Sequence, residues 1–255
     1  MIDLNQPVIK STPSTLTVKL AETDKEREQA FHLRYRVFAE ESNNTQLMNP
    51  MKTEWDAFDQ YCDHLIVKDM QQDSVVGTYR LLPGKRIANH GGFYSEKEFD
   101  LTPLKEHKED ILELGRSCID PKYRSGRTLQ LLWEGIATYL TQNPYRYMIG
   151  CANIHLEKVC EVYQIYSYFK KTGMLSEEFQ INPHPSHRLQ GLTEVQLYLS
   201  EKEIIRKLPP LLKGYRRMGA KIGGEPAYDP IFDSIDFLII LEKSRITQKY
   251  QRRFL

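Results

Sequence analysis

The sequence predicts an α/β fold, and the middle of the chain carries the observations on which this expectation rests. Residues 111–119 have the composition of a strand, and the next segment places its apolar side chains on one face of a helix. That face consists of Leu129, Leu132, Trp133, Ile136, Ala137 and Leu140. A further strand at 147–151 and a further helix from His155 to Lys171 repeat the order, and such alternation is typical of the α/β class.

The N-terminal part of the chain is expected to contribute one strand and one helix. Residues 1–13 are polar with two prolines, which indicates a loose arm. Residues 16–20 alternate apolar and polar side chains as a strand does. Thr23 then precedes a cluster of acidic residues, which predicts a capped helix that ends at about Glu40. Residues 41–60 contain three asparagines and a proline, and predict a long loop of a kind that is commonly functional.

The remaining elements follow from turn residues and alternation. Residues 64–67 and 75–81 predict a hairpin around a turn at 71–73. A pair of prolines opens a predicted helix at 211–218, because proline is well tolerated in the first turn of a helix. Residues 235–241 predict a last strand.

Length and composition limit the class of protein. A chain of 255 residues suits one large domain, which we expect to span residues 14–255 with a basic C-terminal extension from about residue 201. The net charge of +1 argues against a nucleic-acid partner. The four cysteines show no C-x-x-C pair and no cysteine–histidine ligand spacing, so we expect no disulfide, no metal site and a reducing, cytoplasmic location. The longest apolar stretch, residues 237–241, is far shorter than the roughly 20 residues of a membrane-spanning helix, and we expect no signal peptide.

The loop before the 129–140 helix suggests an anion-binding site. Gly126 stands at the start of that helix, where exposed backbone N–H groups and the helix dipole favour a phosphate. Arg124 and Arg127 add positive charge, with Ser125 between them. The phosphate of an acyl donor would fit there, and the alternative is an ordinary strand-to-helix turn with two solvated arginines.

Several short motifs extend the interpretation to most of the chain. They are ELGRSCIDP at 113–121 with YRSG at 123–126, LLWEGIA at 131–137, GCA at 150–152, FD at 58–59 with CDHL at 62–65, and GEPA at 224–227. Together they resemble the ornithine N-acyltransferase family of bacterial ornithine-lipid synthesis, which is also labelled as hemolysins. The resemblance runs from about residue 16 to the C-terminus. It implies a GNAT-like (acyl-CoA N-acyltransferase) fold, with a central mixed sheet flanked by helices and a C-terminal extension.

A more distant similarity is to acyl-homoserine lactone synthases and long-chain N-acyl amino acid synthases. It implies a catalytic pair on the 111–119 strand, Glu113 and Arg116. It also implies a set of substrate-binding residues: Arg34, Phe38, Asp56, Asp59 and Arg80. The phosphate loop departs from the usual GNAT pattern, because Arg124 stands only two residues before Gly126 and Thr128 replaces a small residue.

The resemblance assigns roles for which the residues themselves leave alternatives. Glu113 would accept the proton of the attacking amine, or it is a structural ion-pair partner. Strict alternation along the strand places it on the face opposite Arg116. Asp56 and Asp59 would bind a cationic acceptor side chain, or they cap the loop while Arg34 forms a surface ion pair.

Four further residues carry less specific expectations. Phe38 fits the core as well as a substrate contact, and Arg80 fits the sheet surface as well as an anion anchor. Cys118 and Cys151 are expected to be small buried thiols rather than nucleophiles.

The predicted activity is N-acyl transfer. A (3-hydroxy)acyl chain would move from acyl carrier protein or CoA to the α-amine of an amino acid, first of all ornithine, without a permanently bound cofactor. Another acceptor such as glycine, lysine or tyrosine, an acyl-homoserine lactone product and a non-catalytic membrane-binding protein are the alternatives. Basic, partly apolar segments at 206–221 and 245–255 would dock an acidic carrier protein or lie on the inner membrane surface, or they are a solvated helix face and a frayed tail.

Overall fold

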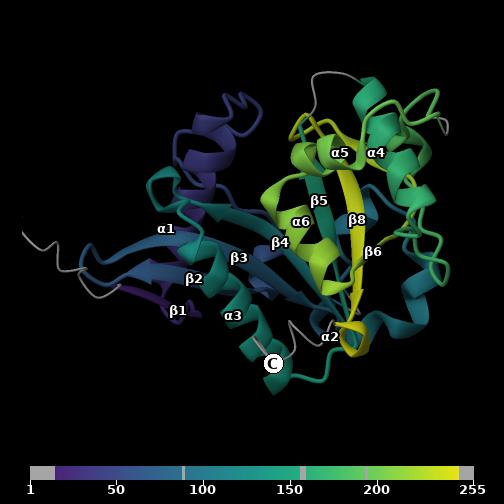
Figure 1. The fold of residues 1–255 in the computed structure, drawn as a ribbon. Coiled ribbons are helices and arrows are strands. Elements are labelled where there is room, and N and C mark those ends of the chain that lie inside the picture. The colour runs from purple at the N-terminus through teal and green to yellow at the C-terminus, as the bar shows by residue number, and fades with distance from the viewer. Residues whose placement is uncertain (1–14, 88–89, 156–158, 193–194, 247–255) are drawn as a thin grey trace, which may run out of the picture.

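The computed structural model describes residues 15–87, 90–155, 159–192 and 195–246, and Figure 1 shows their arrangement. The predicted arm at 1–13 and the tail from 247 lie outside the described residues. The strands are β1 (Leu16–Leu20), β2 (Asp63–Asp69), β3 (Ser74–Pro83), β4 (Ile111–Ile119), β5 (Tyr147–Ile154), β6 (Lys221–Ile222), β7 (Ala227–Asp229) and β8 (Ser234–Glu242). The α-helices are α1 (Asp24–Tyr35), α2 (Gly84–Ile87), α3 (Arg127–Gln142), α4 (Val159–Lys171), α5 (Glu201–Lys207) and α6 (Pro210–Met218).

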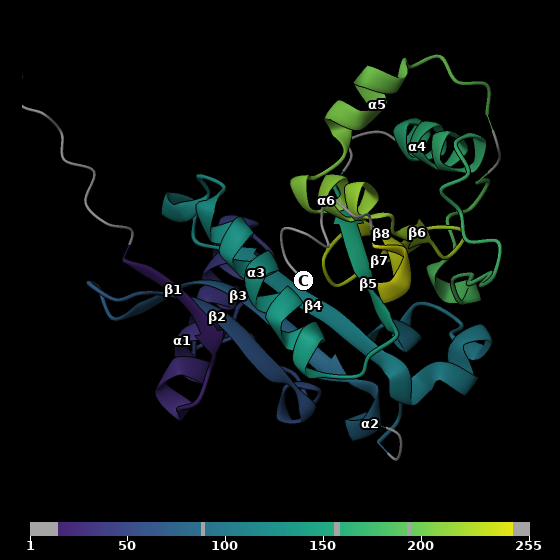
Figure 2. The same cartoon turned by 60° about the horizontal axis from the view of Figure 1, so that its bottom comes forward.

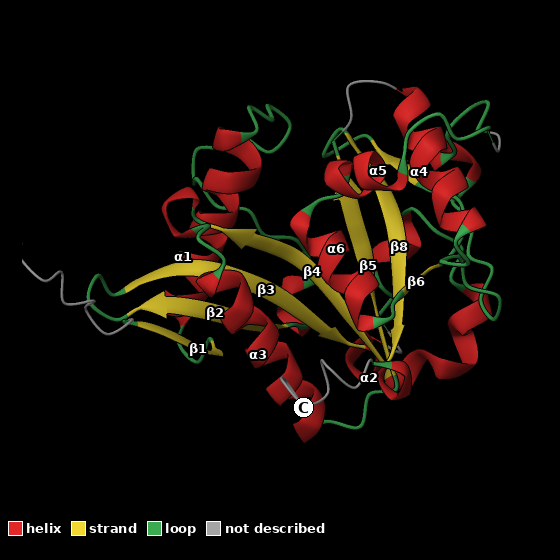
Figure 3. Ribbon diagram, viewed as in Figure 1, coloured by secondary structure: helices red, strands yellow, loops and turns green. Residues whose placement is uncertain are grey.

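These strands form one mixed sheet in the order β1-β2-β3-β4-β5-β8-β6, with β7 paired to β8. Strands β1 to β4 are antiparallel neighbours, β4 and β5 run parallel, and β8 is antiparallel to β5. Figure 3 shows the strands between helices on both sides, which confirms the predicted mixed sheet flanked by helices. The segment after residue 201 supplies β8, so part of the predicted extension is a strand inside the sheet.

The two longest helices next to β1–β4 cover opposite faces of that half of the sheet. Helix α1 packs Ala30 and Leu33 on Ile66 of β2, whereas α3 packs on Leu65 and Val67 of the same strand. Since successive side chains of a strand point to opposite faces, the two helices must lie on opposite sides. Figure 2 shows α3 lying across β1, β2 and β3.

The buried face of α3 differs in part from the predicted one. Leu132, Ile136, Ala137 and Leu140 are buried as expected, but Leu129 and Trp133 are only half-buried. The contact instead centres on Gly135, where an added Cβ would lie 2.7 Å from Val18 and 2.8 Å from Leu65. The helix therefore turns its smallest residue toward β1 and β2, which the spacing of large apolar residues does not reveal.

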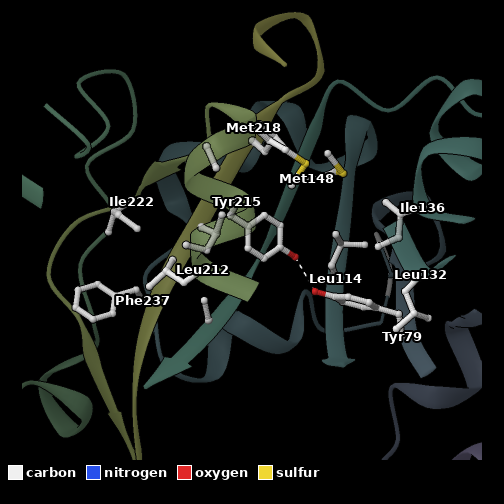
Figure 4. Close-up of a cluster of buried hydrophobic side chains, with 14 of the residues drawn as sticks. Tyr79, Leu114, Leu132, Ile136, Met148, Leu212, Tyr215, Met218, Ile222 and Phe237 are labelled. Atoms are coloured by element: carbon white, nitrogen blue, oxygen red, sulfur yellow. Dashed lines mark hydrogen bonds between the residues drawn. The ribbon is translucent and has the colours of Figure 1, made fainter. Parts of the chain in front are cut away.

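Helix α6 packs on the sheet beside β3 and β8. Tyr215 of α6 and Tyr79 of β3 share a hydrogen bond of 2.7 Å between their hydroxyl groups, and both side chains are buried (Figure 4). Leu212 and Met218 of α6 join the same apolar cluster. Buried tyrosines generally find a hydrogen-bond partner, and this pair ties α6 to β3.

The predicted first helix is confirmed, but its last part has a different geometry. The Thr23 hydroxyl accepts the backbone N–H of Glu26, as the capping pattern indicated. Beyond Tyr35 the chain continues as a π-helix from Arg36 to Glu41. Such wider turns occur frequently at functional sites, and this one carries Phe38 to the cleft.

Candidate active site

The site lies where β4 and β5 diverge. Among the described residues, their ladder contains three pairs, from Ile111–Tyr147 to Glu113–Ile149. The two strands still touch at Gly150, where an added Cβ would lie 2.3 Å from the carbonyl oxygen of Leu114. Beyond that contact they open as a V, which is visible between the β4 and β5 labels in Figure 1.

A cleft occupies the opening of this V. It holds about 740 Å³ of space between atoms, part of it open to solvent, which is the size of a typical ligand site. The strands β3, β4, β5 and β8, the π-helix and α6 contribute its walls. The polar and charged lining residues are Tyr79, Arg80, Tyr94, Ser95, Glu113, Arg116, Ser117, Cys151, Asn153, Asp229, Ser234 and Asp236.

Glu113 is held from one side of this cleft. Its carboxylate accepts the backbone N–H groups of Tyr94 at 2.7 Å and Ser95 at 2.8 Å, and the Ser95 hydroxyl donates to it as well. Burial raises the pKa of Glu113, and these hydrogen bonds oppose that rise. A carboxylate has about four acceptor sites, so three donors leave one site on Glu113 for a group in the cleft.

Arg116 reaches the same cleft because β4 is bulged. Thr78 pairs with Cys118 but Arg80 pairs with Gly115, so β4 contains one residue more than β3 over this stretch. Arg116 has a φ of 52°, which is in the left-handed region. The prediction from strict alternation was therefore wrong, since Glu113 and Arg116 both line the cleft.

Below Arg116 lies a network of arginines and carboxylates. Arg34, which is 1% exposed, bonds Glu54 and Asp59. Arg80 donates to Asp56 at 2.7 Å, and Arg116 donates to Glu54 and to Asp56 at 3.0 Å each. The expectation that Arg34 forms only a surface pair is wrong, because its partners and its guanidinium are buried.

The network sets the ionisation of its acids. Burial opposes the charged form of Asp59, but the hydrogen bonds and charge of Arg34, together with the charge of Arg80, hold the pKa of Asp59 well below its usual value. Arg80 and Arg116 likewise outweigh burial and lower the pKa of Asp56. All four oxygens of Asp56 and Asp59 accept hydrogen bonds, so this pair is occupied by arginines.

Aromatic rings form the outer wall of the cleft. The Arg116 guanidinium lies 4.4 Å from the centroid of the Tyr94 ring and 5.0 Å from that of Phe232. Phe38 is half-buried and meets Phe232 edge-on at 5.6 Å. The structure thus places Phe38 in the cleft wall, and it adds residues that sequence reasoning missed: Glu54, Tyr94, Ser95 and Phe232. Glu54 stands two positions before Asp56, and that clustering of acids was the available signal.

A second acidic group lies deeper in the cleft. Glu98, Cys151 and Asp236 each place one oxygen or sulfur atom within 4.8 Å of the others. Such atoms could hold a cation, but the Cys151 thiol donates to the Ser95 hydroxyl at 3.4 Å, and burial raises its pKa well above the ordinary value. Burial also raises the pKa of Cys118 to about 12. Both cysteines are protonated at neutral pH, which agrees with the expected unreactive thiols.

The predicted phosphate loop precedes α3. Gly126 has a φ of 94° and stands directly before the helix, whose first backbone N–H groups have no partner within the helix. Arg124 forms two bonds to Glu41, at 2.6 and 2.7 Å, while Arg127 lies 3.4 Å from Glu134. Ser125 is exposed. Arg127 therefore has the longer and weaker ion pair of the two arginines.

Comparison with known proteins identifies the family. Residues 33–134 match the family described as an acetyltransferase (GNAT) domain. The L-ornithine N(alpha)-acyltransferase of Agrobacterium fabrum (strain C58) is 35% identical over 246 residues, which cover 92% of this chain and 84% of that protein. The protein of the same name from Brucella abortus (strain 2308) is 34% identical over 253 residues, which cover 95% of this chain and 90% of that protein. The chain belongs to the L-ornithine N(alpha)-acyltransferase family.

The fold of this chain is also similar to those of solved acyl-homoserine lactone synthases. The CoA-dependent acyl-homoserine lactone synthase BjaI matches with a TM-score of 0.50 and 15% identity, over 90% of this chain and 80% of that one. The related synthase MesI matches with a TM-score of 0.51 and 13% identity, over 93% and 95%. At this level of identity the likeness concerns the fold. Both the predicted family and the GNAT-like fold are thereby confirmed, and the protein is an N-acyltransferase enzyme.

The basic segments of this acyltransferase are only partly described. Lys207 pairs with Glu161 at 2.9 Å, and Arg216 contacts Tyr168 and Glu201. These contacts hold α5 and α6 against α4, so the segment at 206–221 has a packing role whatever else it binds. Among the described helices, none combines the length and apolar character needed to cross a membrane.

Proposed function

We propose that the protein transfers a (3-hydroxy)acyl chain from a thioester to the α-amine of ornithine and so forms a lyso-ornithine lipid. The observation that carries the proposal is the 35% identity to an L-ornithine N(alpha)-acyltransferase over 92% of the chain. The cleft supports it, because carboxylates and arginines meet there in a largely buried setting.

The reaction forms a C–N bond and breaks the C–S bond of the thioester. The attacking amine must be neutral, and an α-ammonium group has a pKa near 8. We assign this proton to Glu113, because its carboxylate lines the cleft and retains one acceptor site. Burial raises the pKa of Glu113, which strengthens it as a base for an amine. Two protons leave the nitrogen in all: Glu113 passes the first to solvent, and the second, released as the tetrahedral intermediate collapses, protonates the thiolate, which leaves as the free thiol of the donor.

The tetrahedral intermediate carries a negative oxygen that needs donors. Beyond Glu113, β4 departs from β5, so the backbone polar groups on that edge of β4 face the cleft rather than a ladder. Backbone N–H groups in such a position can stabilise the oxyanion. The same edge can pair with the amides of an extended phosphopantetheine arm, which would align the thioester along β4.

The arginine network is proposed to position the acceptor. Arg80 and Arg116 both line the cleft, and the carboxylates behind them fix their orientation. Their remaining N–H groups suit the α-carboxylate of an amino acid. Phe38 would pack against the acceptor or the acyl chain from the π-helix.

The donor is proposed to enter over α3. The N-terminus of α3, Gly126 and Arg127 would bind the phosphate of an acyl carrier protein or of CoA. The basic segment at 206–221 would approach an acidic carrier protein, and its location would also suit delivery of the product to the inner membrane surface.

Lipid analysis tests the proposal. A host that lacks aminolipids would be compared by mass spectrometry with and without this gene. We expect a new lipid with the mass of singly acylated ornithine. An acylated amino acid other than ornithine would overturn the acceptor but keep the reaction, and the absence of any N-acyl species from cells that contain the folded protein would overturn the proposed function.

A further inference from the structure

A buried pair of carboxyl groups lies next to the proposed reaction centre, and among the described residues it forms no ion pair with a cationic side chain. Glu98 is 3% exposed and Asp236 is 6% exposed, and their carboxylate oxygens lie within 4.8 Å of each other. Among the described residues, the Oε2 atom of Glu98 finds no hydrogen-bond partner. Asp236 accepts the Ser234 hydroxyl at 3.1 Å. A buried charge without a partner is costly, so such a pair normally takes up a proton or a cation.

The surrounding charges do not offset this pair. Asp229 and Glu113 are the other acids that act on Glu98, and Arg116 is the opposing cation. Arg116 already bonds Glu54 and Asp56, each at 3.0 Å. Deep in the cleft the acids therefore outnumber the cations that are free to balance them.

The cleft gives a ligand access to this pair. Asp236 and Cys151 line the cleft directly, and Glu98 stands beside them. The Cys151 thiol contacts the Ser95 hydroxyl at 3.4 Å, and Ser95 in turn donates to Glu113. One thiol and one hydroxyl thus separate the acidic pair from the proposed base. In ornithine, three methylene groups separate the carbon that bears the α-amine from the side-chain nitrogen.

We propose that Glu98 and Asp236 bind the side-chain ammonium group of the acceptor and so select a cationic amino acid. The inference rests on the proposed function, since it names the group of the acceptor that this part of the cleft recognises. It also moves cation binding away from Asp56 and Asp59, whose oxygens are occupied by arginines. An ammonium group is a suitable cation for this pair, because carboxylate oxygens accept its N–H groups.

The experiment compares ornithine with norleucine, which replaces the side-chain ammonium by a methyl group. The purified enzyme, Glu98→Gln and Asp236→Asn would be assayed with both acceptors at a saturating acyl donor. Glu242→Gln serves as the control, because it removes a carboxylate from the far end of β8. Circular dichroism and thermal unfolding would establish that each variant is folded, and Glu98→Gln still tests the proposal if the Asp236→Asn variant does not fold.

We expect the unmodified enzyme to prefer ornithine by about 100-fold or more in kcat/KM, because a site built around a polar group strongly rejects an analogue that lacks it. Glu98→Gln and Asp236→Asn should each lower kcat/KM for ornithine by about 30-fold or more and change kcat/KM for norleucine by less than about 3-fold. The control, Glu242→Gln, should keep both values near those of the unmodified enzyme.

Three results would overturn the inference, and each differs from failure of the proposed function. If both variants still prefer ornithine over norleucine, Glu98 and Asp236 do not bind the ammonium group. Equal losses with both acceptors would assign the pair to chemistry instead. A stoichiometric metal ion that both variants lose would assign it to metal binding. If the unmodified enzyme acylates neither amino acid, the proposed function fails, and calorimetry still tests the site: ornithine binding that equals norleucine binding would overturn it.

Discussion

Glu113 and Arg116 line the same cleft although they stand three positions apart on one strand. A regular strand would point them to opposite faces. The bulge opposite Tyr79 and the φ of 52° at Arg116 restore them to one side. The proposed catalytic centre is thus built on a local irregularity of β4, next to the point where β4 leaves β5.

The first prediction concerns Glu113→Gln. The glutamine NH2 group would replace one of the two carboxylate oxygens and so face a backbone N–H donor, that of Tyr94 or that of Ser95, and we expect a loss of about 1–3 kcal/mol in the free energy of unfolding. We also expect a loss of turnover of about 100-fold or more, as for a general base. Urea unfolding and steady-state kinetics measure the two effects.

Ser95→Ala is the matched control for that variant. It removes one hydroxyl donor and leaves the carboxylate, so stability should fall by about 1 kcal/mol while most turnover remains. A Glu113→Gln variant as active as Ser95→Ala would contradict the role of Glu113 as base.

The second prediction concerns the network under Arg116. Arg34→Met removes the main partner of Asp59 and one of the two arginine partners of Glu54, both of which are buried, so we expect a destabilisation of about 3–5 kcal/mol by urea unfolding. Arg36→Ala removes an exposed arginine 3.4 Å from Asp120 and should cost less than about 1 kcal/mol. Equal costs for the two substitutions would show that the network contributes little to the fold.

The third prediction is the pH dependence of stability. Burial, with the neighbouring Asp236 and Asp229, raises the pKa of Glu98 to about 9, and burial with Asp229 raises the pKa of Asp236 to about 7. A carboxyl group whose pKa is raised on folding stabilises the folded state at low pH, where the group is protonated in the folded and the unfolded protein alike. This contribution is lost as the pH rises to the pKa of the group in the folded protein. The acceptor-free protein should therefore lose stability from about pH 4, near the ordinary carboxyl pKa, up to about pH 9, by up to about 1.4 kcal/mol per pH unit for each proton.

Thermal unfolding across that range is the measurement. The double variant Glu98→Gln with Asp236→Asn should show a flatter profile than the unmodified protein. Ornithine should stabilise the unmodified protein more at pH 8 than at pH 6, because the pair is then more fully charged. An identical profile for the double variant would rule out this pair as the source.

The fourth prediction concerns the donor site. Arg127→Ala should raise KM for the acyl donor by about 3- to 10-fold and leave KM for ornithine unchanged, because an exposed arginine contributes modestly to phosphate binding. Arg146→Ala, which removes an exposed arginine near Glu242, is the control. An effect on ornithine rather than on the donor would contradict a phosphate site at the start of α3.

The sequence predicts the helices and strands around the cleft because their signals are local. The Thr23 cap, the apolar face of α3, the alternation of β1 and the apolar run of β8 are read from neighbouring residues, and the structure has these elements. Helix α5 was missed although Ser200 and Glu203 form a capping box that the sequence shows plainly.

The parts of the site that sequence reasoning missed depend on contacts between distant segments. Glu98, Cys151 and Asp236 meet only because β5 lies beside β8 and the segment after Tyr94 folds over both. The bulge at Arg116 likewise follows from the register with β3, and strand alternation alone predicts the opposite side.

The central claim is most directly tested by tandem mass spectrometry of the product that the purified enzyme makes from ornithine and a 3-hydroxyacyl carrier protein. We expect one singly acylated product whose fragments place the acyl chain on the α-nitrogen and leave the side-chain amine free. A product acylated on the side-chain nitrogen, or no N-acyl product with a competent donor present, would contradict it.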